Sequence, residues 1–415
     1  MINVNFSSES QQRGFLYQST DLDSFIELEN KASIVAYTGF DPTGPSLHVG
    51  HLLPLMWLRL LAKHGHKPIV LVGGATSLIG DPSGKDSQRP LLTVEKIEEN
   101  IASLSPVFKK IICADSDIEL EIVNNYDWLS SVQYLTFLRD VGYHFSVNRM
   151  LTFDSVKSRL QREHPLSFLE FNYMVLQAYD FMHLHQQYGC VLQMAGSDQW
   201  GNIVCGIDLA RKSINASLYG LTAPLLTTST GKKMGKTEGG AIWLNENLTS
   251  HFEFWQYWRN TDDADVVRFL KLFTDLSLEN IEELLKNHQN DINALKVILA
   301  DQVTSIVRGS MCLADIHKQA NALFGMAQDP NDLMKFATRL ACDTFPIVFE
   351  DFCVNQSLFA SKSEVRRMIQ GGGIKLNGEI ISNSKIYLSS ETFMNNQGLL
   401  MISVGKKKHF NFKLA

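Results

Sequence analysis

The sequence lacks the features that mark exported, membrane-spanning and metal- or disulfide-stabilised proteins. The longest mainly apolar stretch, residues 69–80, is too short to cross a bilayer and is interrupted by glycines. Acidic side chains such as Glu9 and Asp21 replace the basic and then apolar segments of a signal peptide. We therefore expect a cytoplasmic protein that does not associate with a membrane.

Cysteine is scarce, and the cysteines form no metal-binding or disulfide motif. No C-x-x-C pair occurs among the cysteines, which lie far apart at positions 113, 190, 205, 312, 342 and 353. This spacing argues against a zinc site and against a disulfide framework. We expect free thiols and no metal site built by the protein.

The net charge is small, but the charged residues are unevenly distributed along the chain. The formal net charge of the 415 residues is -6. Residues 357–415 nevertheless contain nine Lys or Arg against three Asp or Glu. A basic end on an acidic chain is compatible with binding to nucleic acid. Apolar content of 45% and charged content of 20% are those of a folded globular protein, and the length predicts several domains.

The first half of the chain alternates strand and helix signals. Residues 33–40, 68–74 and 190–195 are apolar or β-branched runs that lead into glycine-containing turns, whereas residues 48–64 have the apolar spacing of a helix. This alternation predicts an α/β fold with a buried parallel sheet that extends to about residue 225. Residues of about 110–165 have helical stretches and look like an insertion between the two halves of the sheet.

The second half is helical and then mixed. Residues 249–324 have helical patterns throughout. The basic end predicts a helix over 364–370, strands over 374–376 and 379–381, and a turn at Asn377–Gly378, which together form a small α+β module. The predicted domains are residues 1–225, 226–325 with a catalytic loop and helices, a linker over 326–356, and the module over 357–415.

Two histidines lie where the first strand passes into the first helix. His48 and His51 are three residues apart and share a face of the first helical turn, beside unpaired backbone N–H groups. Gly50 between them leaves room for a nucleotide against the backbone. The pattern favours a phosphate site. Two histidines at a helix start are, however, often ordinary surface residues.

A second segment, residues 231–237, reads G-K-K-M-G-K-T and contains Lys232, Lys233 and Lys236. Ammonium groups on a flexible, glycine-flanked loop suit contact with pyrophosphate oxygens whose charge increases during a reaction. Taken alone, the segment would more often be a solvated basic loop.

Together the two segments resemble the paired signatures of class I aminoacyl-tRNA synthetases, in the same order and on the same elements. Other segments narrow the resemblance to the bacterial tyrosyl-tRNA synthetase family: residues 37–43, 80–84, 125–128, 145–148, 177–180 and 196–201. Gly235 stands where the general class I pattern has serine, although glycine is usual in this family. The resemblance covers nearly the whole chain and implies a Rossmann-like catalytic domain with a helical insertion, a helical domain and an S4-like domain.

The resemblance implies that ATP and tyrosine react to give an adenylate, and that the acyl group then passes to tRNA(Tyr). It assigns the triphosphate to His48, His51, Lys233 and Lys236, with Thr43. Further ATP contacts are implied for a set of residues along three motifs: Gly39, Asp41, Gly50, Gly196, Asp198 and Gln199. Mg2+ is expected to arrive with ATP, and no tightly bound cofactor is expected.

A stripe of polar residues on an otherwise apolar predicted helix is compatible with a binding site for an amino acid. Tyr173, Gln177 and Asp180 lie at positions i, i+4 and i+7 among apolar neighbours, which makes a solvent-facing stripe a poor explanation. The resemblance places Tyr173, Gln177 and Asp81 at the substrate ammonium. It places Tyr37 and Asp180 at the phenol hydroxyl, with Gln193 nearby.

The resemblance also implies a homodimer and an RNA-binding C-terminal module. Its candidate phosphate contacts are Arg366, Arg367, Lys375, Lys406, Lys407 and Lys408. Two alternatives remain at this point. One is a tryptophanyl-tRNA synthetase-like enzyme, which the S4-like end and the Tyr37/Asp180 pair disfavour. The other is a catalytically dead synthetase that binds RNA, which the intact histidines and lysines disfavour.

Overall fold

The computed structural model describes residues 5–83, 92–113, 118–229, 231, 234–237, 240–289, 291–324, 334, 337–341, 345–356, 358–394, 396, 398–405 and 408–414. The chain divides into two compact units. The first contains Met1–Gly235 and Ile242–Arg308, and the second contains Lys236–Ala241 and Gly309–Ala415. Each unit is described by itself.

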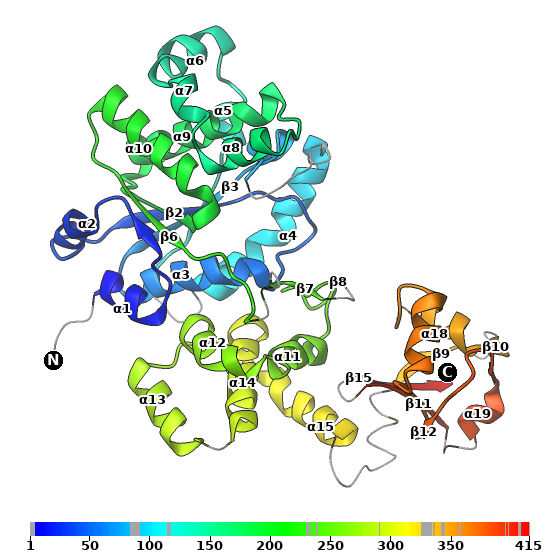
Figure 1. Cartoon of the computed structure of the whole chain (residues 1–415). Helices are drawn as coiled ribbons and strands as arrows, with labels where there is room; N and C mark the ends of the chain where they lie inside the picture. The colour runs from blue at the N-terminus through cyan, green and yellow to red at the C-terminus, as the bar shows by residue number, and fades with distance from the viewer. Residues whose placement is uncertain are drawn as a thin grey trace. The chain divides into compact units, whose positions relative to one another are not determined.

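A six-stranded sheet forms the centre of the first unit (Figure 1). Its order is β1-β6-β5-β2-β3-β4, and all neighbours are parallel except the edge strand β1. The bounds are β1 (Gln18–Ser19), β2 (Val35–Phe40), β3 (Lys67–Val72), β4 (Glu121–Asn124), β5 (Leu192–Gly196) and β6 (Tyr219–Ala223). In β3 only Lys67 is exposed, as expected of a parallel strand covered on both faces. The predicted α/β fold with a parallel sheet is confirmed.

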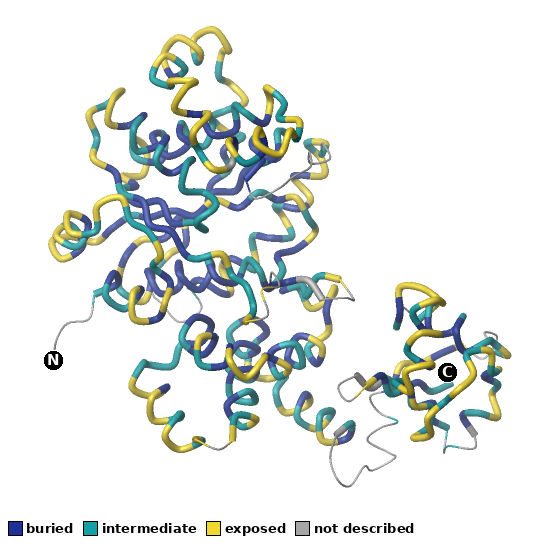
Figure 2. Tube along the Cα trace, viewed as in Figure 1, coloured by how far each residue is buried: buried dark blue, intermediate teal, exposed yellow. Residues whose placement is uncertain are grey.

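Helices cover both faces of this sheet, with α3 (Leu52–Lys63) and α4 (Val94–Ile112) on one side and α9 (Phe168–Tyr188) and α10 (Trp200–Ile214) on the other (Figure 1). Ser167 and Glu170 form a capping box at the start of α9, and Gly189 ends it in the left-handed conformation. Figure 2 shows the strands as the most buried part of the unit. The N-terminal helices of this unit are α1 (Phe6–Arg13) and α2 (Leu22–Glu29).

The connection between β4 and β5 contains the short helices α5 (Tyr126–Leu129), α6 (Tyr134–Asp140), α7 (Val147–Met150) and α8 (Asp154–Gln161). Strand β4 itself lies inside the range of about 110–165 that we expected to be a helical insertion. It is four residues long and pairs with β3 at the edge of the sheet, so the helical connection to β5 begins only after residue 124.

A helical layer follows in the same unit, with α11 (His251–Arg259), α12 (Val266–Phe273), α13 (Leu278–Asn287) and α14 (Ile292–Arg308). Arg13 joins this layer to α1, because its guanidinium donates to the carbonyl oxygens of Lys271 at 3.0 Å and Leu276 at 2.9 Å. Arg59 of α3 pairs with Asp275 at 2.6 Å. Charge-assisted bonds of this kind fix the helices against the sheet domain.

The second unit contains α15 (Leu313–Phe324) and a five-stranded sheet of order β12-β11-β14-β15-β9. Predicted strand 374–376 is β11 (Ile374–Leu376), and the turn at Asn377–Gly378 has positive φ at both residues. The other elements are β9 (Thr338–Leu340), β10 (Ile347–Val348), α17 (Phe349–Asn355), α18 (Lys362–Gln370), β12 (Glu379–Ile380), β13 (Tyr387–Leu388), α19 (Ser390–Met394), β14 (Leu399–Val404), β15 (Lys408–Leu414) and the hairpin β7 (Lys236–Thr237) and β8 (Gly240–Ala241).

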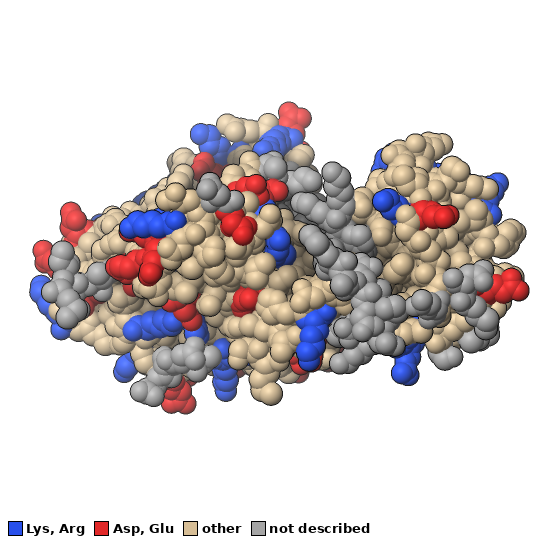
Figure 3. Space-filling view, turned by 90° about the horizontal axis from the view of Figure 1, so that it is seen from below, with Lys and Arg blue, Asp and Glu red and all other residues tan. Residues whose placement is uncertain are grey.

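Two surface properties complete the description. Among the helices of the described residues, none combines the length and the apolar content required to cross a membrane. On the face drawn in Figure 3, acidic and basic side chains of the described residues are intermixed rather than separated into areas of one sign.

Candidate active site

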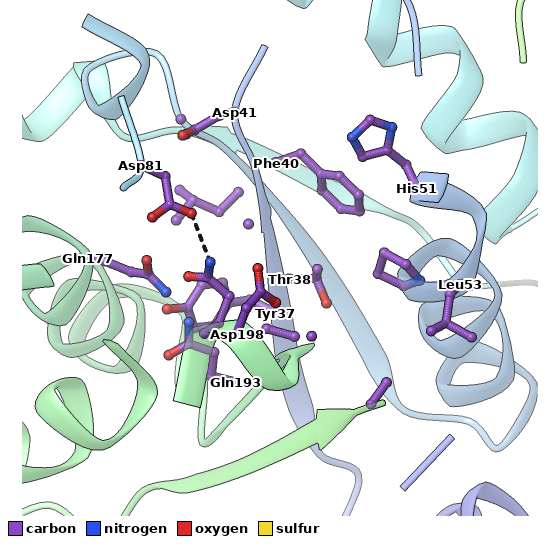
Figure 4. A pocket seen from close by; sticks show the side chains of 18 of the residues that line it. Tyr37, Thr38, Phe40, Asp41, His51, Leu53, Asp81, Gln177, Gln193 and Asp198 are labelled. Atoms are coloured by element: carbon purple, nitrogen blue, oxygen red, sulfur yellow. Dashed lines mark hydrogen bonds between the residues drawn. The ribbon is translucent and has the colours of Figure 1, made fainter. Parts of the chain in front are cut away.

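A cavity of about 360 Å³ opens at the carboxyl ends of β2 and β5 (Figure 4). These neighbouring strands continue in opposite directions across the sheet, because β2 is followed by β3 on one side and β5 by β6 on the other. Such a reversal point is where open α/β sheets bind ligands.

The cavity brings together most of the residues that the sequence singled out for ATP and tyrosine. Its lining includes Tyr37, Gly39, Asp41, Thr43, Gly50, His51, Asp81, Tyr173, Gln177, Asp180, Gln193, Gly196, Asp198 and Gln199. His48 lies beside this cavity without lining it. Lys233 lies outside the described residues, and Lys236 is described only as backbone in β7.

A chain of hydrogen bonds runs along one wall of the cavity. Tyr173 Oη donates to Asp41 Oδ2 at 3.0 Å, and Thr76 Oγ1 donates to Asp41 Oδ1 at 2.9 Å. Asn125 Nδ2 donates both to Thr76 Oγ1 at 3.1 Å and to Asp180 Oδ2 at 2.9 Å. The chain links the end of β2 to the middle of α9, so the two ends of the cavity share one polar network.

Asp180 is the most buried carboxylate of the cavity, with 1% of its surface exposed. It accepts hydrogen bonds from Asn125 Nδ2 and, at 2.8 Å, from Trp128 Nε1. Burial raises the pKa of Asp180 to about 7, although both hydrogen bonds act to lower it; nearby Asp41 raises it further. Such a carboxyl group changes charge near neutral pH.

Tyr37 lies in the same region and is fully buried. Its hydroxyl has no hydrogen-bond partner among the described residues, and neither does Gln193 Oε1. Burial, with the charge of Asp180 as a smaller cause, holds the pKa of Tyr37 well above its usual value, so this hydroxyl remains a donor. Buried polar groups without partners are rare and cost free energy. Their presence in a cavity indicates that a polar ligand group completes them.

A second set of hydrogen-bonded side chains also lines the cavity. Gln199 Nε2 donates to Asp81 Oδ2 at 2.8 Å, which is the dashed line in Figure 4. Asn202 Nδ2 donates to Gln177 Oε1 at 3.0 Å and to Gln199 Oε1 at 2.9 Å. The amide of Asn202 therefore fixes the orientation of two glutamines that the sequence had assigned to ligands.

The histidine turn forms a short 3-10 helix, Val49–His51, ahead of α3. Gly50 N donates to His48 Nδ1 at 3.0 Å, and His48 N donates to His51 Nδ1 at 3.2 Å. Because Nδ1 accepts in both rings, each neutral imidazole carries its proton on Nε2. Both rings are thus prepared to donate from Nε2.

The lysine-containing segment reaches this turn through its glycine. A Cβ on Gly235 would lie 2.8 Å from Gly50 N and 2.8 Å from His48 Nδ1, and Gly235 has a φ of +95°. Conversely, a Cβ on Gly50 would lie 3.1 Å from Met234 O. The two sequence signatures therefore meet through their glycines, and serine would not fit at position 235 without movement.

The basic candidates of the second unit have different surroundings. Arg366 forms a two-pronged pair with Glu350, at 2.8 Å from Nε and 2.7 Å from Nη2, and the Arg366 bond lowers the pKa of Glu350 to about 2. Arg367 and Lys375 are exposed. Lys406 and Lys407 lie outside the described residues, and Lys408 is described only as backbone.

Sequence reasoning missed four residues that orient the site: Thr76, Asn125, Trp128 and Asn202. Asn125 and Trp128 belong to a motif used for the resemblance, but no local spacing connected them with Asp180. Their position at the end of β4 became informative only once the sheet order was known.

Comparisons with known proteins agree with this geometry. A family model described as tRNA synthetases class I (W and Y) matches residues 29–325, and one described as S4 domain matches residues 351–391. A tyrosine–tRNA ligase of Zymomonas mobilis is 50% identical over 402 residues, which cover 96% of each chain. One of Pelagibacter ubique is 46% identical over 413 residues, or 99% of each chain.

A solved structure is also similar. The crystal structure of a C-terminally truncated mitochondrial tyrosyl-tRNA synthetase from Aspergillus nidulans has a TM-score of 0.69 and 30% identity, and the match covers 76% of this chain and 93% of that one.

Proposed function

The chain belongs to the tyrosyl-tRNA synthetases of class I, and from this premise we propose how its residues divide the work. As a tyrosine–tRNA ligase it uses ATP to convert tyrosine into tyrosyl-adenylate and passes the tyrosyl group to tRNA(Tyr). The proposed parts are a phenol site, an ammonium site, a triphosphate site, an RNA surface and a dimer contact.

The proposed function depends mainly on the phenol site. Tyr37 Oη has no partner among the described residues, and Asp180 keeps acceptor capacity beside its bonds from Asn125 and Trp128. A substrate hydroxyl that accepts from Tyr37 and donates to Asp180 satisfies both groups. Phenylalanine would leave them unpaired; tyrosyl-tRNA synthetase is itself the reference case for this rejection, roughly 10⁵-fold.

The ammonium site lies among the remaining carboxylates. Asp41 and Asp81 line the same cavity as Tyr173 and Gln177, and clustered negative charge favours a cation. We assign Tyr173, Gln177 and Asp81 to the substrate ammonium, with Gln193 beside the tyrosine. Asp41, held by Tyr173 and Thr76, keeps the Tyr173 hydroxyl in place.

The triphosphate site lies at the histidine turn. The Nε2–H groups of His48 and His51 donate to phosphate oxygens, with Thr43, Lys233 and Lys236 as further contacts. Gly39, Asp41, Gly50, Gly196, Asp198 and Gln199 surround the rest of ATP. The tyrosine carboxylate attacks the α-phosphate and pyrophosphate leaves, so catalysis consists of positioning and charge stabilisation. Mg2+ is proposed to enter bound to ATP.

The S4 module is proposed to bind tRNA(Tyr) through Arg367 and Lys375, with Lys406, Lys407 and Lys408. Arg366, the remaining candidate for an RNA contact, pairs with Glu350, which favours a role in holding α18 to α17. The domain division predicted from the sequence, with residues 357–415 as the RNA module, and a cytoplasmic location remain proposals.

The dimer contact is proposed on the apolar patch of α6, the following turn and α7, defined as Tyr134, Leu135, Leu138, Tyr143 and Val147. All five side chains are more than half exposed, and Figure 2 colours much of this segment as exposed. Contiguous exposed apolar side chains mark association surfaces.

Amino-acid-dependent exchange of pyrophosphate into ATP tests the function. Tyrosine should support exchange, whereas phenylalanine and tryptophan should not. Exchange with tryptophan alone would favour a tryptophanyl enzyme, and exchange with no amino acid would favour an inactive scaffold that binds RNA.

A further inference from the structure

A tryptophan that the proposed mechanism does not use lies against His48. The ring centroids of His48 and Trp243 are 6.2 Å apart, and the ring planes form an angle of 57°. On another side, Gly50 N donates to His48 Nδ1, and a Cβ built on Gly235 would lie 2.8 Å from the same nitrogen. His48 is therefore bordered by the histidine turn, the lysine segment and the extended segment that carries Trp243.

The segment around Trp243 is paired with the histidine turn through backbone hydrogen bonds. His48 and Trp243 form an antiparallel bridge. Val49 N donates to Ile242 O at 2.9 Å, and Leu244 N donates to Leu47 O at 2.7 Å. The position of Trp243 relative to His48 is thus set by backbone bonds on both sides of the ring pair, and not by side-chain packing alone.

The Trp243 segment is itself anchored to the helical layer. Trp243 N donates to Thr249 Oγ1 at 3.0 Å. Arg308, the last residue of α14, is 7% exposed and donates from Nη2 to both Trp243 O and Thr249 O, each at 3.0 Å. The Arg308 guanidinium also lies 4.9 Å from the ring centroid of Phe254. A continuous series of contacts therefore connects Arg308 at the end of α14, through Trp243, with His48.

The indole extends towards the cavity as well. A Cβ on Gly44 would lie 3.9 Å from two atoms of the Trp243 ring. Gly44 follows Thr43, which lines the cavity. Trp243 therefore contacts the two backbone segments that carry the triphosphate candidates Thr43 and His48, although it lies outside the cavity lining itself.

We propose that Trp243 is a positioning residue for adenylate formation, which holds His48 so that its Nε2–H meets the triphosphate. This inference rests on the proposed function of the histidine turn. The indole borders the His48 ring together with His51, whose ring centroid lies 4.0 Å from that of His48. Catalysis by positioning is sensitive to such restraint, because a displacement of about 1 Å can cost about 10²-fold in rate.

The test compares Trp243→Leu and Trp243→Phe in the full-length enzyme by single-turnover formation of tyrosyl-adenylate. Because Trp243 contacts the phosphate side and not the phenol site, the leucine variant should lose about ten-fold or more in rate at saturating tyrosine, with a raised KM for ATP. Its dissociation constant for tyrosine should stay within about two-fold of wild type, and phenylalanine should restore the rate to within about three-fold.

A double-mutant cycle with His48→Asn separates positioning from general packing. If Trp243 acts through His48, Trp243→Leu should cost less than about two-fold in the His48→Asn background. Fully multiplicative losses would overturn the inference. If the leucine variant does not fold, Trp243→Met, which keeps an apolar side chain in the same space, takes its place in the cycle.

Trp255→Leu is the matched control. Trp255 is 4% exposed on α11, and its Nε1 donates to Asp301 Oδ1 at 2.7 Å, so its loss removes a buried indole elsewhere in the same unit. The Trp255→Leu variant should have a lower melting temperature than wild type, but its KM for ATP should not rise more than its KM for tyrosine. An equal rise of KM for ATP in Trp243→Leu and Trp255→Leu would overturn the inference. A wild-type enzyme without tyrosine-dependent exchange would instead overturn the proposed function.

Discussion

Asn125 donates a 2.9 Å hydrogen bond to Asp180 across 55 residues of chain. The same amide nitrogen donates to Thr76 Oγ1, which in turn donates to Asp41. Asn125 thus orients the carboxylate of Asp180 at the proposed phenol site and connects it with the end of β2. The Asn125 carbonyl oxygen also accepts from Ala75 N at 2.8 Å, so the side chain cannot rotate without losing bonds on both sides.

Asn125→Ala should weaken the use of tyrosine. A hydrogen bond to a charged group contributes about 1.5–3 kcal/mol, so KM for tyrosine should rise about ten-fold or more, whereas KM for ATP should change less than about three-fold. Steady-state exchange kinetics measure both. Asn124→Ala is the control, because Asn124 Oδ1 accepts from Gly74 N and Tyr126 N and does not contact Asp180. Equal rises in both variants would contradict the assignment.

The pKa of about 7 at Asp180 predicts a proton linked to tyrosine binding. The phenol donates to the carboxylate form, so binding at pH 7 should release a proton, and KM for tyrosine should fall as pH rises from 6 to 8. Calorimetric titrations in buffers of different ionisation enthalpy measure the proton. Asp180→Asn should abolish this release, and an unchanged release in that variant would refute the assignment.

The same group affects stability in the free enzyme. Its folded pKa is raised above the ordinary value of 3.8, so its contribution to the free energy of unfolding is fully present below about pH 3.8 and is lost as pH rises towards 7. The melting temperature of wild type relative to Asp180→Asn should therefore decline between pH 5 and 8. A constant difference over this range would show that Asp180 is already ionised.

Local sequence patterns predicted the helices and strands, whereas the order of the strands in the sheet determined which residues meet in the cavity. Apolar runs and glycine stops located β2, β3, β5 and α3, and the seven-residue spacing from Tyr173 to Asp180 predicted one polar face of α9, whose members line the cavity. The Thr76–Asn125–Asp180 chain could not be predicted, because it joins residues about fifty positions apart through the β3–β4 pairing. The tautomers of His48 and His51 likewise depend on bonds within the turn that residue types alone do not specify.

Arg366 and Arg367 should differ in their effects although they are adjacent. Arg367→Ala removes an exposed cation, so it should weaken tRNA binding and reduce the slope of log affinity against log salt by about 1. Arg366→Ala leaves Glu350 without its guanidinium partner and should mainly lower the melting temperature of the C-terminal module. Filter binding over a salt series and thermal unfolding separate the two. An equal change of salt slope in both variants would assign Arg366 to RNA as well.

The apolar patch of α6 and α7 should control association. Leu135 is 77% exposed at its centre, and a charge buried at a contact between two copies is costly unless it is paired. Leu135→Glu should therefore shift sedimentation equilibrium from a dimer towards a species of 46.7 kDa. Met311→Glu, at a residue 95% exposed in the other unit, adds the same charge elsewhere and should leave the dimer intact. A wild-type chain that sediments only as the 46.7 kDa species at working concentration would remove the dimer from the proposal, and the patch would then require another partner.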